Sequence, residues 1–84
     1  MNGRLTDVII EDEYFTDERT GIRQIGRSMI VWADMEMKES LKMIEGISTV
    51  IVHLDIPTRY YVYIDPRYDR EFLKAEIEAV CKGA

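Results

Sequence analysis

The sequence predicts a small α+β domain with the element order ββαββα, and two patterns along its 84 residues support this prediction. Four segments carry apolar residues that are contiguous or alternate with other residues, as β-strands do. Two further segments place apolar residues three and four positions apart, which is the spacing of an amphipathic α-helix. A chain of this length has the size of one domain, so we expect residues 1–84 to form a single domain.

The first two strands are expected at residues 5–15 and 22–33, which contain the apolar runs VII and MIVW. Residues 16–21 lie between these segments, are polar, and end at Gly21. Such a composition is typical of a hairpin loop. We therefore expect the two strands to be antiparallel neighbours.

A helix is expected after each pair of strands. Asp34 is a suitable N-cap for the first helix, which should run for about three turns until Gly46 stops it. Asp65 followed by Pro66 is a suitable start for the second helix, which should end near Gly83. The expected apolar stripes are Met37, Leu41 and Ile44 in the first helix and Leu73, Ile77, Val80 and Cys81 in the second.

The last two strands are expected to form a second hairpin. Apolar residues alternate over residues 47–56 until Pro57 ends the strand, and they alternate again over residues 59–65. We expect a tight turn at Pro57 and Thr58 between these two strands.

Handedness then sets the topology of the sheet. A right-handed crossover through the first helix places the second and third strands parallel, with the fourth strand in the gap between them. The predicted four-stranded sheet is therefore antiparallel or mixed, has the order 1-2-4-3, and carries both helices on one face. This architecture resembles a ferredoxin-like plait whose last strand has moved to the start of the chain, a circularly permuted ferredoxin-like plait.

The sheet face away from the helices is the main functional candidate. The helices are expected to cover the side that carries Val50, Val52, Leu54, Val62 and Ile64. The candidate interface on the opposite side consists of Arg27, Met29, Ile51, His53, Arg59, Tyr61 and Tyr63. A contiguous apolar and aromatic surface of this kind marks an interface or a ligand surface. Alternation leaves the register of the first hairpin open, and a one-residue shift would exchange the two sides of its strands.

Three functions compete for this face. The one we favour is self-association or binding of a partner protein, because Tyr, Met and Arg are frequent interface residues and a small domain gains stability when they are covered. The second is RNA binding. The third is a small-molecule or metal site around His53 and Asp55, although a single histidine excludes a zinc site with several histidines. In a purely structural interpretation, Tyr61 and Tyr63 only pair with neighbours across the hairpin.

The segment RYYVYI at residues 59–64 resembles the aromatic core of the third-strand signature of the RNA-recognition motif. The resemblance implies that Tyr61 and Tyr63 stack on RNA bases. The sequence departs from the signature at Tyr60 and Val62, where the motif has small residues, and its second strand lacks a clear aromatic partner. RNA binding is therefore the alternative to self-association.

Charge and composition bear on several classes of partner. The chain has 11 basic and 16 acidic residues, a net charge of −5, and no basic stripe that would attract a phosphate backbone. Its single cysteine cannot form an internal disulfide, and no apolar run is long enough for a signal peptide or a membrane span. We therefore expect a cytoplasmic protein without a membrane partner.

No motif predicts catalysis, so we expect no enzyme, no cofactor and no metal. Residues 21–28, GIRQIGRS, have the glycine spacing of a phosphate-binding loop but lead into a strand instead of a helix. The acidic residues at 11–18 lack the ligand spacing of a calcium loop. Cys81 is expected on the buried stripe of the second helix, away from His53, the base that it would need as a nucleophile.

Overall fold

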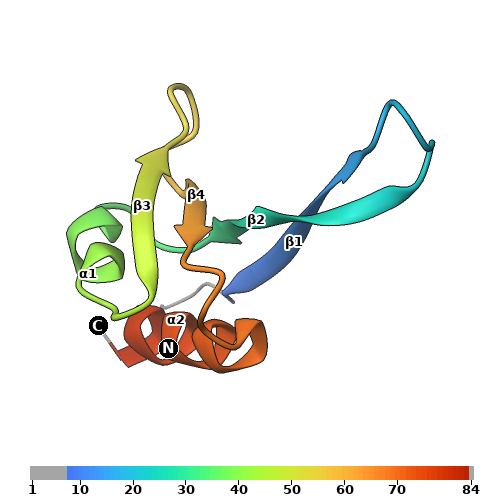
Figure 1. Ribbon diagram of the computed structural model, residues 1–84. Helices are drawn as coiled ribbons and strands as arrows, with labels where there is room; N and C mark the ends of the chain where they lie inside the picture. The colour runs from blue at the N-terminus through green and yellow to red at the C-terminus, as the bar shows by residue number, and fades with distance from the viewer. Residues whose placement is uncertain (1–7, 84) are drawn as a thin grey trace.

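The computed structural model describes residues 8–83, which form a four-stranded sheet and two helices (Figure 1). The elements are β1 (Ile9–Thr16), β2 (Arg23–Trp32), α1 (Lys38–Lys42), β3 (Ile47–Val52), β4 (Arg59–Ile64) and α2 (Arg70–Gly83). The strand order is β1-β2-β4-β3, and each neighbouring pair is antiparallel. The predicted α+β class, element order and strand order are therefore confirmed.

One hydrophobic core joins the sheet to both helices. Val31 of β2 and Tyr60 and Val62 of β4 are fully buried in it, together with Leu41 of α1 and Leu73 of α2. Successive residues of a strand point to opposite faces of the sheet. Both helices therefore cover the same face, and residues 8–83 leave the other face uncovered.

The prediction that Met29 lies on the uncovered face was wrong. Met29 and Val31 are completely buried in the core beneath the helices. Their neighbour Ile30 pairs directly with Tyr61 of β4, and directly paired residues share a face. Ile30 and Trp32 therefore lie on the uncovered face, in place of Met29. Every residue of the run MIVW is apolar, so hydrophobicity alone cannot decide which alternate residues face the core.

The first helix is much shorter than expected, because a buried tyrosine holds the chain that precedes it. The Tyr60 hydroxyl donates a hydrogen bond to the Asp34 carbonyl oxygen at 2.6 Å and accepts one from the Met37 amide at 3.0 Å. Asp34 is therefore part of a loop and not an N-cap. Helix α1 spans only Lys38–Lys42 and has no side-chain cap at its start.

The second helix starts later than expected. Asp65 accepts hydrogen bonds from the backbone and side chain of Arg67, which form a turn before the helix. The cap is instead Asp69, whose carboxylate accepts a hydrogen bond from the Phe72 amide at 2.9 Å.

The β3–β4 connection spans residues 53–58 and is longer than expected, because β3 ends at Val52. It contains the expected tight turn at Pro57 and Thr58, where the Arg59 amide donates to the Ile56 carbonyl oxygen at 3.0 Å. The His53 amide donates to the Arg59 carbonyl oxygen at 2.9 Å and closes this loop at its base. Leu54 lies in the loop with 89% of its surface exposed, so its expected position under the helices was wrong.

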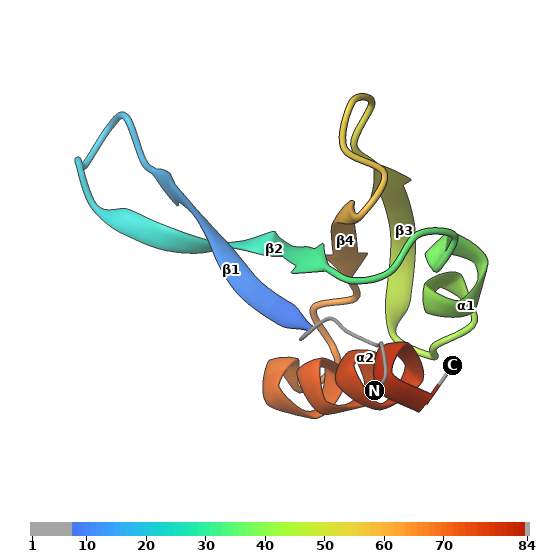
Figure 2. The same cartoon turned by 180° about the vertical axis from the view of Figure 1, so that it is seen from behind.

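The β1–β2 hairpin extends away from the rest of the molecule as a long twisted ribbon (Figures 1 and 2). We call residues 13–25 the arm. The register of β1 against β2 shifts between Asp12 and Tyr14, at the point where the arm begins. Strand β2 pairs with β4 only from Ser28 onward. Within residues 8–83, the arm is therefore a two-stranded ribbon without a third strand beside it.

Candidate functional site

The uncovered side of the sheet carries an apolar and aromatic surface, which we call the open face. Tyr61 lies near its centre and pairs with Ile30 of β2 on one side and with Ile51 of β3 on the other. Ile51 on the edge strand β3 and Tyr63 on the inner strand β4 are 48% and 40% exposed, so large apolar side chains face outward from both strands. The open face consists of Ile30, Trp32, Ile51, Arg59, Tyr61 and Tyr63.

Arg59 is the charged residue within this surface. Its guanidinium carbon lies 5.0 Å from the centre of the Trp32 ring and 5.3 Å from that of Tyr61, so the cation rests between two aromatic rings. The Arg59 Nε is buried and has no hydrogen-bond partner among the residues that the structure describes. Within residues 8–83, no carboxylate forms a salt bridge with Arg59. The open face thus presents a cation that a carboxylate or phosphate of a partner can neutralise.

His53 lies at the edge of the open face and has a structural role in the loop. Its Nδ1 accepts hydrogen bonds from the Asp55 and Ile56 amides, both at 3.1 Å. Its ring centre is 6.1 Å from that of Tyr61. His53 therefore shapes the loop beside the open face.

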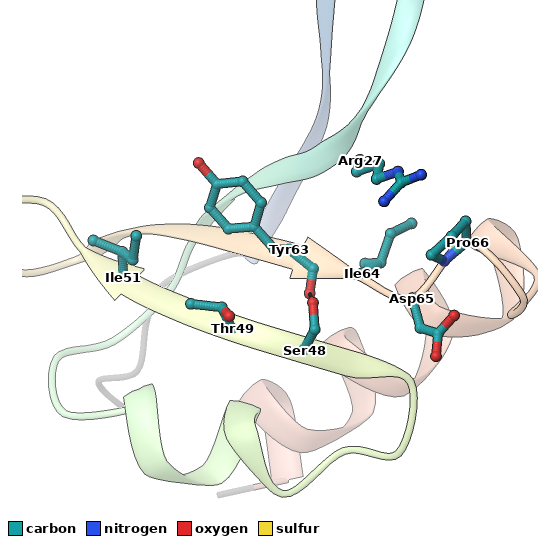
Figure 3. Close-up of a pocket in the computed structure, with 8 residues that line it drawn as sticks. All are labelled: Arg27, Ser48, Thr49, Ile51, Tyr63, Ile64, Asp65 and Pro66. Carbon is teal, nitrogen blue, oxygen red and sulfur yellow. Dashed lines mark hydrogen bonds between the residues drawn. The ribbon is translucent and has the colours of Figure 1, made fainter.

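Arg27 lies apart from Arg59, at a groove of about 560 Å³ near the end of β4 (Figure 3). Tyr63 forms the wall that the groove shares with the open face, and the Ser48 hydroxyl donates a hydrogen bond to the Tyr63 carbonyl oxygen at 3.1 Å. Hydrogen bonds from Arg67 lower the pKa of Asp65 to about 2, and the Arg27 charge acts in the same direction. The groove lining is Arg27, Ser48, Thr49, Ile51, Tyr63, Ile64, Asp65 and Pro66.

Strand β1 places carboxylates beside the open face. Glu11 is exposed and pairs with Ile30, so it lies on the same side of the sheet as Tyr61. Glu13 accepts a hydrogen bond from the hydroxyl of the buried Ser28. The open face thus has an acidic margin on β1 and a cation, Arg59, on β4.

The structure brings together four of the seven predicted interface residues: Ile51, Arg59, Tyr61 and Tyr63. His53 and Arg27 flank them, and Met29 is absent from the face because it is in the core. The sequence analysis missed Ile30 and Trp32. The pairing of Ile30 with Tyr61 would have identified both, but this pairing is a tertiary property.

Other kinds of site find little support in the described part of the chain. Within residues 8–83, no three His, Cys, Asp or Glu side chains converge on a position where they could hold a metal ion. Burial raises the pKa of the Cys81 thiol to about 11, which opposes formation of a reactive thiolate. No helix within this range has the length and apolar character needed to cross a membrane.

Comparisons of the chain with protein-family models, with curated proteins and with solved structures found no match.

Proposed function

We propose that this chain is a small cytoplasmic binding module that self-associates through the open face. The observation that carries the proposal is the cluster of Trp32, Tyr61, Tyr63 and Ile51 around Arg59, which forms no salt bridge with any residue from 8 to 83. Aromatic residues and arginine dominate the energetics of protein interfaces. We propose a circularly permuted ferredoxin-like plait as the architecture of the chain. The uncovered face supports it, because in such a plait the helices lie on one side of the sheet only.

A second copy of the chain suits the charges of this surface. In a twofold dimer the same patch meets itself, so a cation at one position requires an anion elsewhere in the patch. Arg59 on β4 and Glu11 on β1 supply this pair on the same side of the sheet. In such a dimer the Arg59 of one copy pairs with the Glu11 of the other.

The test is the sedimentation of the purified chain over a wide concentration range, together with two variants that each replace an apolar residue by glutamate. Ile51→Glu puts a charge on the open face, and Phe72→Glu puts the same charge at a similarly exposed position on α2. We expect a dimer for the unmodified chain and for Phe72→Glu, and a monomer for Ile51→Glu. A strictly monomeric unmodified chain, or equal behaviour of the two variants, would refute the proposal.

A second candidate function is binding of single-stranded RNA, which the position of Trp32 favours. Trp32 provides an aromatic ring on β2, beside the β4 tyrosines, where the sequence had shown no clear aromatic partner. Base stacking on such rings contributes about 1–3 kcal/mol per base. The acidic margin at Glu11 weakens attraction of a phosphate backbone, so self-association stands first.

Trp32 is the single tryptophan of the chain and therefore reports directly on this alternative. If RNA is the ligand, a short single-stranded oligonucleotide quenches the Trp32 fluorescence, and the affinity falls as the salt concentration rises. An unchanged emission spectrum at low salt excludes the RNA hypothesis.

A further inference from the structure

The arm exposes large apolar side chains on both of its faces. Tyr14, Phe15, Ile22 and Ile25 are each between 45% and 57% exposed. Tyr14 pairs with Ile25 on one face, where the Arg23 guanidinium lies 4.6 Å from the Tyr14 ring centre. A two-stranded hairpin is at best marginally stable in water without a covering layer. The arm therefore gains stability when another surface packs against it.

The other side of the arm carries Phe15 and Ile22. Phe15 is four residues from Glu11 in β1, so alternation along the strand continues the open side of the sheet into this side of the arm, across the register shift after Asp12 and with the twist of the ribbon. The pairing of Phe15 with Gln24 places Ile22 on the same side. Phe15 and Ile22 therefore form one apolar side of the arm, opposite Tyr14 and Ile25.

Helix α2 clamps the base of the arm. Arg70 and Lys74 form salt bridges of 2.7 and 2.8 Å with Asp12, and Arg70 also donates to the Gly26 carbonyl oxygen. The three charged side chains are only 17–24% exposed. A clamped arm loses less conformational entropy when it docks than a mobile one would.

The size of the open face argues that the arm participates in self-association. A standard interface involves about 20–30 residues on each partner. The open face consists of six residues on β2, β3 and β4. When each copy also docks its arm, residues 13–25 of both copies add to the contact.

We infer that the arm of each copy packs across the open face of a second copy, with the side that carries Phe15 and Ile22 against Tyr61, Tyr63 and Ile51. The exchange is reciprocal and closes into a twofold dimer. This inference rests on the proposed self-association and assigns the arm as the segment that completes the interface.

The first test compares Phe15→Ser with Phe72→Ser, which remove the same side chain at 51% and 52% exposure from the arm and from α2. We expect Phe15→Ser to weaken dimerisation about tenfold or more, and Phe72→Ser to leave it within about twofold, by sedimentation. Circular dichroism of each variant verifies that it is folded. Equal dissociation constants for the two variants would refute a role for the arm.

The second test locates the arm directly. A photoreactive p-benzoyl-phenylalanine in place of Phe15, in a mixture of isotopically light and heavy chains, should crosslink between copies to peptides from residues 47–64. Crosslinks within one copy only, or to another segment of the partner, would refute this placement. If Ile51→Glu still abolishes the dimer in that case, the proposed self-association stands without the arm. A monomeric unmodified chain would refute both.

Discussion

Tyr60 shows how a single buried residue determines local structure. The tyrosine is fully buried, and its hydroxyl bonds to the chain that precedes α1 at two points, the Asp34 carbonyl and the Met37 amide. A segment whose sequence favours a helix therefore forms a loop. The neighbouring Tyr61 and Tyr63 point the other way and form the open face, so adjacent tyrosines serve opposite layers of the molecule.

We expect Tyr60→Phe to lower the free energy of unfolding by about 1–3 kcal/mol, because it leaves the Met37 amide and the Asp34 carbonyl without this partner. Urea unfolding measures the effect. Tyr14→Phe removes the same atom from a ring that is 50% exposed, on the side of the arm away from the proposed contact, and should change stability by less than about 0.5 kcal/mol. Equal losses for the two variants would contradict the structural role of the Tyr60 hydroxyl.

At the scale of elements, close packing between α2 and the loops decides how the sheet is covered. Gly46, which follows α1, has a φ of 100°, and a β-carbon at this position would lie 2.8 Å from Leu73 and 2.9 Å from Tyr68. Glycine is therefore required both by the backbone conformation and by the approach of α2. The same helix holds the arm through Arg70 and Lys74.

We expect Gly46→Ala to destabilise the protein by about 2–4 kcal/mol, because it adds a steric clash to backbone strain. Gly21→Ala is the matched control: its φ is 74°, but nothing lies within 4 Å of the added carbon. That variant should cost only about 1 kcal/mol. Thermal unfolding of both variants gives the comparison, and equal costs would mean that the contact with α2 is not tight.

The salt bridges of Asp12 with Arg70 and Lys74 predict that the free energy of unfolding depends on pH. Burial raises the pKa of the Asp12 carboxyl, but hydrogen bonds from Lys74 and Arg70 lower it more, so the pKa lies below its usual 3.8. A carboxyl with a lowered pKa stabilises the folded state above about pH 4, and this contribution is lost as the pH falls further. Asp12→Asn should therefore cost about 1–2 kcal/mol at pH 7 and reduce the dependence of stability on pH below 4.

The control for Asp12 is Glu76→Gln on the exposed surface of α2, which should leave both the stability at pH 7 and its acid dependence unchanged. Urea unfolding between pH 2.5 and 7 measures both quantities. An acid dependence of Asp12→Asn that equals that of the unmodified chain would show that the clamp contributes nothing through this carboxyl.

At the scale of the whole molecule, the small size of the chain makes its uncovered sheet face important for stability. A chain of 84 residues buries a limited share of its surface on folding, so covering the open face and the arm adds directly to stability. The net charge of −5 opposes association in general. A dimer therefore depends on local complementarity, such as that between Arg59 and Glu11.

Self-association predicts that the melting temperature depends on protein concentration. For the unmodified chain, a hundredfold increase in concentration should raise the melting temperature by about 5 to 10 °C, because mass action favours a folded dimer. Ile51→Glu should melt at the same temperature at all concentrations. Calorimetry measures both, and a constant melting temperature for the unmodified chain would contradict a folded dimer in that range.

The sequence by itself determined the α+β class, the strand order, and the side of the sheet on which Ile51, Tyr61 and Tyr63 lie, because local alternation and handedness govern these features. Only the tertiary structure decided that Met29 is buried while Trp32 joins the open face. In a strand whose residues are all apolar, the register of pairing with the neighbouring strand sets which residues face the core. The length of α1 and the direction of the arm also depend on distant contacts. Tyr60 bonds to Asp34 across 26 residues and Arg70 to Asp12 across 58, and no local pattern encodes such contacts.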